Sequence, residues 1–125
     1  MQALLHYFLH LIFPAAIAWI FFRKGWKKAY LIMLSTMLVD LDHLLADPIF
    51  DANRCSIGFH LLHSYWAILI YILLLIPKGW IRVVAIGVLF HMLTDFIDCL
   101  VMFNQCSECF VDAPAYDLLN WFSVL

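Results

Sequence analysis

Residues 36–47 read TMLVDLDHLLAD and close one of four long apolar runs in the chain. Asp40, Asp42 and His43 come at the end of a nearly unbroken apolar stretch that starts at Ala29. A carboxylate in such surroundings costs several kcal/mol unless another group compensates its charge or satisfies its hydrogen bonds. The stretch therefore predicts a hydrophobic helix whose polar end needs partners from other parts of the chain.

The composition is that of a membrane protein. Of the 125 residues, 66% are hydrophobic and 13% are charged, whereas soluble domains are roughly 45–50% apolar and about 25% charged. Crossing a hydrocarbon core takes roughly 20 apolar residues. Four runs approach or reach that length: 3–22, 29–45, 59–76 and 80–103. The net charge of −2 is small, and the few basic residues do not form a patch that would bind nucleic acid.

The charges beside the turns predict the topology. Six basic residues flank two short turns: Arg23, Lys24, Lys27 and Lys28 beside the first, Lys78 and Arg82 beside the second. The positive-inside rule places these turns in the cytoplasm and both chain termini outside. Because short turns make neighbouring helices antiparallel, we predict an all-α, four-helix transmembrane bundle over residues 1–103. Residues 104–125 form an extracytoplasmic tail, whose short helix after Pro114 either lies on the membrane surface or packs on the bundle.

Eight polar residues of these runs are predicted to share one depth. At 1.5 Å of rise per residue, they lie roughly 16–24 Å above the cytoplasmic ends of their helices. Each helix supplies one pair spaced i,i+3 or i,i+4, and such a pair projects from one helix face. The pairs are His6 and His10, Asp40 and His43, His60 and His63, and His91 and Asp95. We therefore expect all eight side chains to meet in the outer half of the bilayer.

Imidazoles and carboxylates together are ligands for Zn²⁺, or for another divalent first-row metal such as Mn²⁺. Eight candidates exceed the four ligands of one tetrahedral site, so we expect either one ion with orienting partners or two ions. Asp42 points elsewhere on its helix than Asp40 and is the candidate catalytic general base, with an orienting role or a loop cap as alternatives. A hydrogen-bonded polar network without metal is the competing interpretation of the whole set.

The four cysteines are expected on the outer side of the membrane: Cys55, Cys99, Cys106 and Cys109. An oxidising compartment there favours structural disulfides. The C-x-x-C spacing of Cys106 and Cys109 also allows a cysteine zinc site. The sequence leaves the pairing open.

Three motifs carry a resemblance to a known family. The motifs are DLDH at 40–43, HLLHS at 60–64 and HMLTD at 91–95, and the early histidine His6 precedes them. On these residues the sequence resembles the bacterial membrane-bound metal-dependent hydrolases of the YdjM type, and it is similar to an uncharacterised family of small bacterial membrane proteins. The resemblance implies a zinc-dependent hydrolase in the bacterial cytoplasmic (inner) membrane. The HLLHS motif departs from the family, because members commonly carry an arginine, a potential anion-binding group, where Leu61 stands.

Two functions compete. The favoured one is a metal-dependent hydrolase that acts on a lipid or lipid-linked (phospho)ester at the outer half of the bilayer, with membrane lipids as partners. The alternative is a non-catalytic metal-binding membrane module, either a carrier, a sensor or a metal-stabilised scaffold, because a bundle of 125 residues has little room for a substrate cavity. The inner halves of the runs are almost wholly apolar, which argues against an ion pathway through one chain, but a homodimer could create one.

Overall fold

The computed structural model describes residues 2–49, 51 and 53–124, and this part of the chain contains helices and loops but no strand. The first long helix combines α1 (Gln2–Tyr7), the π-helix η1 (Phe8–Ile12) and α2 (Phe13–Phe21), and the remaining elements are η2 (Arg23–Gly25), α3 (Trp26–Ser35), η3 (Thr36–Leu45), η4 (Leu61–His63), α4 (Tyr65–Leu73), α5 (Trp80–Gln105), η5 (Ser107–Phe110) and α6 (Tyr116–Ser123). The all-α prediction is confirmed.

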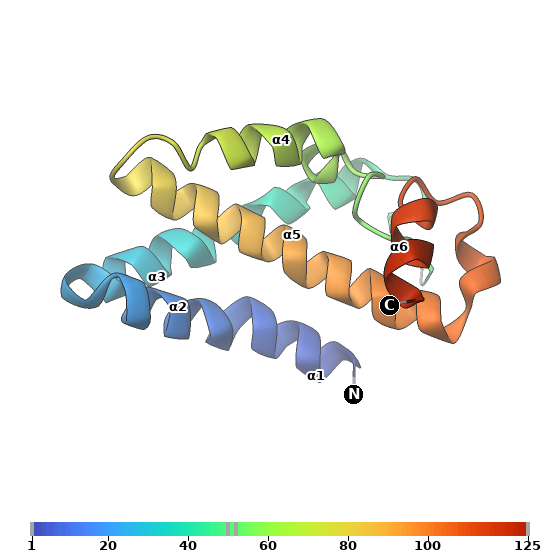
Figure 1. Ribbon diagram of the computed structural model, residues 1–125, viewed down its shortest axis with the longest axis horizontal. Helices are drawn as coiled ribbons and strands as arrows, with labels where there is room; N and C mark the ends of the chain where they lie inside the picture. The colour runs from blue at the N-terminus through green and yellow to red at the C-terminus, as the bar shows by residue number, and fades with distance from the viewer. Residues whose placement is uncertain (1, 50, 52, 125) are drawn as a thin grey trace.

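Helix α5 is the centre of the fold. It is 26 residues long, and α1, α3, α4 and α6 all pack against it. In Figure 1, α4 and the first long helix lie on opposite sides of α5, and α6 covers its C-terminal end. Two segments of the described chain are long and apolar enough to cross a membrane, Leu4–Phe21 and Trp80–Gln105.

The other two apolar runs differ from the expected long α-helices. Only Tyr65–Leu73 of the third run is α-helical, and its nine residues extend about 13 Å. Helix α4 starts there because Ser64 is extended and its Oγ accepts a hydrogen bond from the backbone N–H of Ala67 at 3.3 Å. The second run is helical throughout, but it changes from α-helix to 3-10 helix at Thr36. The arrangement of four membrane-spanning helices therefore stays a prediction.

The 3-10 geometry of η3 sorts the DLDH stretch onto three faces, because three residues make one turn. One face is exposed and apolar, and consists of Leu38, Leu41 and Leu44. A second face points into the protein and contains the buried Thr36 and Asp42, whereas Asp40 and His43 lie half-buried on the third. Asp40 and His43 thus share a face as predicted, and Asp42 is turned inward.

A close helix contact sets the distance between η3 and α5. A Cβ atom on Gly87 would lie 3.0 Å from the Cα of Met33 and 3.0 Å from the Cγ2 of Thr36. A residue without a side chain is therefore required for this approach of α3 to α5. Because Asp40 follows Thr36 by little more than one turn, the contact also sets how near Asp40 comes to α5.

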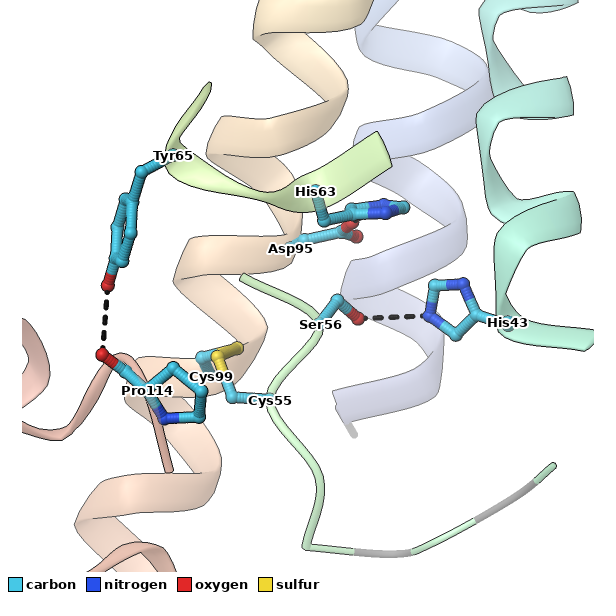
Figure 2. The surroundings of a disulfide bond; sticks show 8 residues. All are labelled: His43, Cys55, Ser56, His63, Tyr65, Asp95, Cys99 and Pro114. Atoms are coloured by element: carbon cyan, nitrogen blue, oxygen red, sulfur yellow. Dashed lines mark hydrogen bonds and ion pairs between the residues drawn. A yellow bond between two sulfur atoms is a disulfide. The ribbon is translucent and has the colours of Figure 1, made fainter. Parts of the chain in front are cut away.

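Two disulfides, Cys55–Cys99 and Cys106–Cys109, answer the question of pairing. All four cysteines are thereby consumed, so the alternative of a cysteine zinc site does not form. The Cys55–Cys99 bond fastens the irregular segment between η3 and η4 to α5 (Figure 2). The segment that leads into His60 and His63 is therefore held against the helix that carries His91 and Asp95.

The C-terminal tail packs on the bundle. Leu119 of α6 is fully buried in one hydrophobic cluster with Phe103 and Phe110. The rings of Phe96 and Phe122 also meet, with centroids 5.2 Å apart. Of the two alternatives for the tail, the structure shows the packed one.

Candidate metal centre

Four side chains from three separate elements converge in the interior. Asp40 comes from η3, His63 from η4, and His91 and Asp95 from successive turns of α5. The Nε2 atom of His91 lies 3.0 Å from Oδ1 of Asp40 and 3.3 Å from Oδ2 of Asp95. The Nε2 atom of His63 lies 3.4 Å from the same Asp40 oxygen and 3.0 Å from the same Asp95 oxygen. We call these four residues the central group; Figure 2 shows the His63 ring beside the Asp95 carboxylate.

Four of the six separations within the central group match those of a small tetrahedral cation site. Nitrogen and oxygen ligands about 2.0–2.1 Å from a zinc ion lie about 3.3–3.4 Å from one another in a regular tetrahedron. The four separations between 3.0 and 3.4 Å are close to that value. Hydrogen bonds could give the same distances, but His63 Nε2 and Asp95 Oδ2 find no hydrogen-bond partner among the described residues. These two buried atoms therefore lie close together without forming a hydrogen bond to each other.

Asp42 lies behind His63 rather than at the central group. Its Oδ2 accepts a hydrogen bond from the backbone N–H of Leu62 at 2.7 Å and one from Nδ1 of His63 at 3.1 Å. A carboxylate on Nδ1 fixes the tautomer and leaves the Nε2 lone pair free to bind a metal. The other oxygen, Oδ1, accepts from Nδ1 of His43 at 3.1 Å. Since both oxygens are engaged, this geometry gives Asp42 a positioning role instead of the general-base role that the sequence suggested.

A second group shares Asp95 with the first and contains His6 and His10. Nδ1 of His10 donates to the backbone carbonyl of His6 at 3.1 Å, while its Nε2 faces Oδ1 of Asp95 at 3.5 Å. That Nε2 atom has no hydrogen-bond partner in the described chain. The ring of His6 contacts the carboxylate of Asp98, one turn beyond Asp95. Asp95 thus presents one oxygen to each group.

The π-helix explains how His10 reaches this position. Pro14 lacks a backbone N–H and its ring would clash with the carbonyl of residue 10 in a regular α-helix. The helix widens at this point, and the backbone N–H of Phe13 bonds to the carbonyl of Phe8, five residues earlier. His10 lies inside this widened turn and is buried.

The third group contains Asp42, His43 and His60. The imidazole of His43 is held on both sides, since Nδ1 donates to Asp42 and Nε2 lies 3.1 Å from the hydroxyl of Ser56 (Figure 2). The ring of His60 stacks on that of His43 with centroids 3.8 Å apart. Because both nitrogens of His43 have partners, the third group has the character of a hydrogen-bonded network.

Among the residues of the metal centre, Asp40 and His43 form the partly exposed edge. The side chains of Asp40 and His43 are 36% and 29% exposed, whereas that of His63 is fully buried and that of Asp95 is 7% exposed. The exposed leucine face of η3 lies next to this opening. An incoming molecule would therefore reach the central group past Asp40 and along an apolar surface.

The structure brings all nine candidate residues of the sequence analysis into the three groups, with Asp40, His63, His91 and Asp95 at the centre. Ser56 was not foreseen, because it lies in an irregular segment and 13 positions from its partner His43. The only signal in the sequence is the neighbouring Cys55, since a disulfide at that residue fixes the local backbone.

Comparison with known proteins identifies a family but no activity. Residues 1–102 match a protein family described as a family of unknown function, DUF6122. No curated protein matches the chain. No solved structure matches it either.

Proposed function

The chain belongs to the DUF6122 family, whose function is unknown, and we propose from its own residues that it is an integral membrane metalloprotein. We propose further that it is a metal-dependent hydrolase of a lipid or lipid-linked (phospho)ester. The observation that carries the proposal is the convergence of two imidazoles and two carboxylates at tetrahedral separations, with unpartnered buried atoms among them.

The proposed cofactor is Zn²⁺ in the central group, because nitrogen and oxygen ligands in a compact set of four are typical of zinc. His6, His10 and the second oxygen of Asp95 would hold a second ion. Mn²⁺ is the alternative metal, since it also accepts imidazole and carboxylate ligands.

A divalent ion in this position supplies an activated water and stabilises the negative charge that develops on an attacked ester. The protein's own residues do the rest of the work. Asp42 holds His63 in the tautomer that a ligand needs, as described above. His43 is held by Asp42 and Ser56 at both ring nitrogens, and its Nδ1 lies 3.7 Å from Asp40, so it supports the exposed edge of the site as a positioning residue.

The surroundings of the opening support a lipid-like substrate. Leu38, Leu41 and Leu44 are each more than half exposed beside Asp40, and exposed apolar surface of this kind is stable in a hydrocarbon phase. A lipid could therefore place its ester at Asp40 and its acyl chain along the leucines. A soluble phosphoester would gain nothing from this face.

The proposed setting is a four-helix bundle in a bacterial cytoplasmic membrane, with both termini outside. The two candidate spanning helices support a membrane location. Arg23 of the first basic turn and Trp80 after the second basic turn line the same hollow. This supports placing both turns on the same side of the membrane. The orientation follows from the positive-inside rule.

The second candidate function is a metal-binding module without chemistry. The burial of His63, His91 and Asp95 favours it, since a closed site binds metal firmly but leaves little room for a substrate. The exposed edge at Asp40 favours hydrolysis. The two functions differ in whether metal removal abolishes a turnover or only lowers stability.

Reconstitution into lipid nanodiscs tests the proposal. The full-length protein is assayed for headgroup and fatty-acid release from phosphatidylglycerol and phosphatidylethanolamine, with and without a chelator, beside His63→Ala and the control Asp47→Asn. We expect turnover by the wild type and the control that is lost on chelation and restored by zinc, and none by His63→Ala. Equal turnover by His63→Ala would refute the hydrolase, and metal binding without turnover of any lipid ester would favour the non-catalytic module.

A further inference from the structure

A second site lies away from the metal centre, at the end of the molecule formed by the two basic turns. Here the α2–α3 turn and the start of α5 enclose an open hollow of about 550 Å³. Val83 lines it and precedes His91 by eight residues on α5, or about 12 Å along the helix. No residue of the central group lines this hollow.

The rim of the hollow carries unbalanced positive charge. Arg23, Lys24 and Lys28 all line it. In the described part of the chain, the only ion pair of a lysine or arginine is Arg54 with Asp51, in another loop. The three cations are therefore available to an anionic ligand that enters the hollow.

The wall of the hollow is apolar and continuous with the outer faces of the helices. It consists of Phe21, Phe22, Ala29, Ile32, Trp80 and Val83. At the same end of the molecule, the guanidinium of Arg23 lies 5.0 Å from the ring centre of Trp19. Tryptophan beside basic residues is typical of the level at which lipid headgroups meet the acyl chains. A ligand of this hollow therefore meets cations at one end and hydrocarbon at the other.

We propose that this hollow binds an anionic phospholipid, with its phosphate on Arg23, Lys24 and Lys28 and the upper part of one acyl chain along Ile32 and Val83. Basic pockets between membrane helices on the cytoplasmic side recognise anionic headgroups in this way. A free anion would leave the apolar wall unused, and a zwitterionic lipid would not use the excess charge. The hollow contains none of the proposed metal ligands, so lipid binding there is tested independently of the proposed hydrolase activity.

Two charge-matched double variants test the proposal. Lys24→Gln/Lys28→Gln removes two cations that line the hollow, whereas Lys27→Gln/Lys78→Gln removes two from the same turns that do not line it. Each purified full-length protein is titrated in detergent with phosphatidylglycerol, phosphatidylcholine or inorganic phosphate, and bound lipid is counted by native mass spectrometry. Circular dichroism checks that both variants keep the helical content of the wild type.

We expect phosphatidylglycerol to bind the wild type and the Lys27/Lys78 variant with equal affinity. Its affinity for the Lys24/Lys28 variant is expected to be lower by a factor of at least about 10. Ile32→Trp, which fills the hollow without changing its charge, is expected to weaken the lipid to a similar extent. Equal losses in both double variants would overturn the proposal, because they would assign binding to general surface charge. Displacement of the lipid by millimolar phosphate, or equal binding of phosphatidylcholine, would also overturn it.

Discussion

Replacing Asp42 by Asn isolates the contribution of one buried carboxylate to the metal centre. The Oδ2 atom of Asp42 accepts from Leu62 N–H at 2.7 Å and from His63 Nδ1 at 3.1 Å. An asparagine oxygen can keep both hydrogen bonds in the same place, and its NH2 group then faces Nδ1 of His43, which accepts from it in the other imidazole tautomer. The fold is therefore retained while the negative charge behind His63 is lost. Alanine would instead leave Nδ1 of the fully buried His63 without its partner, at a cost of about 1–3 kcal/mol.

The size of the expected effect follows from this geometry. A hydrogen bond to a charged group is roughly twice as strong as one between neutral groups. Loss of a carboxylate that orients a ligand histidine typically lowers metal affinity about 10–100-fold, which equals about 1.4–2.8 kcal/mol of binding free energy. We therefore expect the zinc dissociation constant of Asp42→Asn to rise by a factor in that range, with the melting temperature of the metal-free protein nearly unchanged.

Competition against a chromogenic zinc chelator measures this dissociation constant. Asp47→Asn is the matched control, because it removes the same charge two residues after η3 from an exposed side chain. The control is expected to bind zinc like the wild type. An Asp42→Asn variant that binds zinc within about twofold of the wild type would refute the argument that Asp42 prepares His63 as a ligand.

Three further predictions concern the support of the site. Gly87→Ala is expected to lower the unfolding free energy by about 1–3 kcal/mol and to weaken zinc binding. Gly25→Ala is the control, because nothing lies within 4 Å of its new Cβ, and it should change neither quantity. Chemical denaturation measures the first quantity and the chelator assay the second. Replacing Cys55 and Cys99 by Ser opens a loop of 44 residues and is expected to cost about 4 kcal/mol of unfolding free energy, so an unchanged denaturation midpoint would contradict the clamping role of the disulfide. Asp95→Asn should remove both metal positions together, and retention of one ion per chain by mass spectrometry would show that Asp95 is not shared.

The sequence predicted the residues of the site better than their arrangement. The i,i+4 spacing of His91 and Asp95 on a long apolar run determines one helix face, and both side chains reach the central group from α5. The i,i+3 spacing of Asp40 and His43 fits a 3-10 helix as well as an α-helix, so both geometries put these residues on one face. Side-chain spacing was therefore sufficient where the two residues of a pair belong to one regular helix.

Other features depend on contacts that spacing does not encode. The inward turn of Asp42 follows from the 3-10 geometry of η3, and neither Asp42 nor its neighbours signal that geometry. His60 and His63 were placed on a helix but lie before it, because Ser64 caps α4 and the Cys55 disulfide holds the preceding segment against α5. The disulfide is a tertiary contact and the Ser64 cap is a local one, and an apolar run alone predicts the length of a helix poorly when either intervenes.

The metal content of the purified protein tests the proposed metal centre most directly. The full-length chain is prepared without a histidine tag or added metal, offered zinc and manganese in separate samples, dialysed, and measured by inductively coupled plasma mass spectrometry beside His63→Ala and Asp95→Ala. We expect one or two divalent ions per wild-type chain and their loss in the variants. Wild-type protein that is folded but retains no metal after both offers would contradict it, and the His and Asp side chains would then be a buried hydrogen-bonded network.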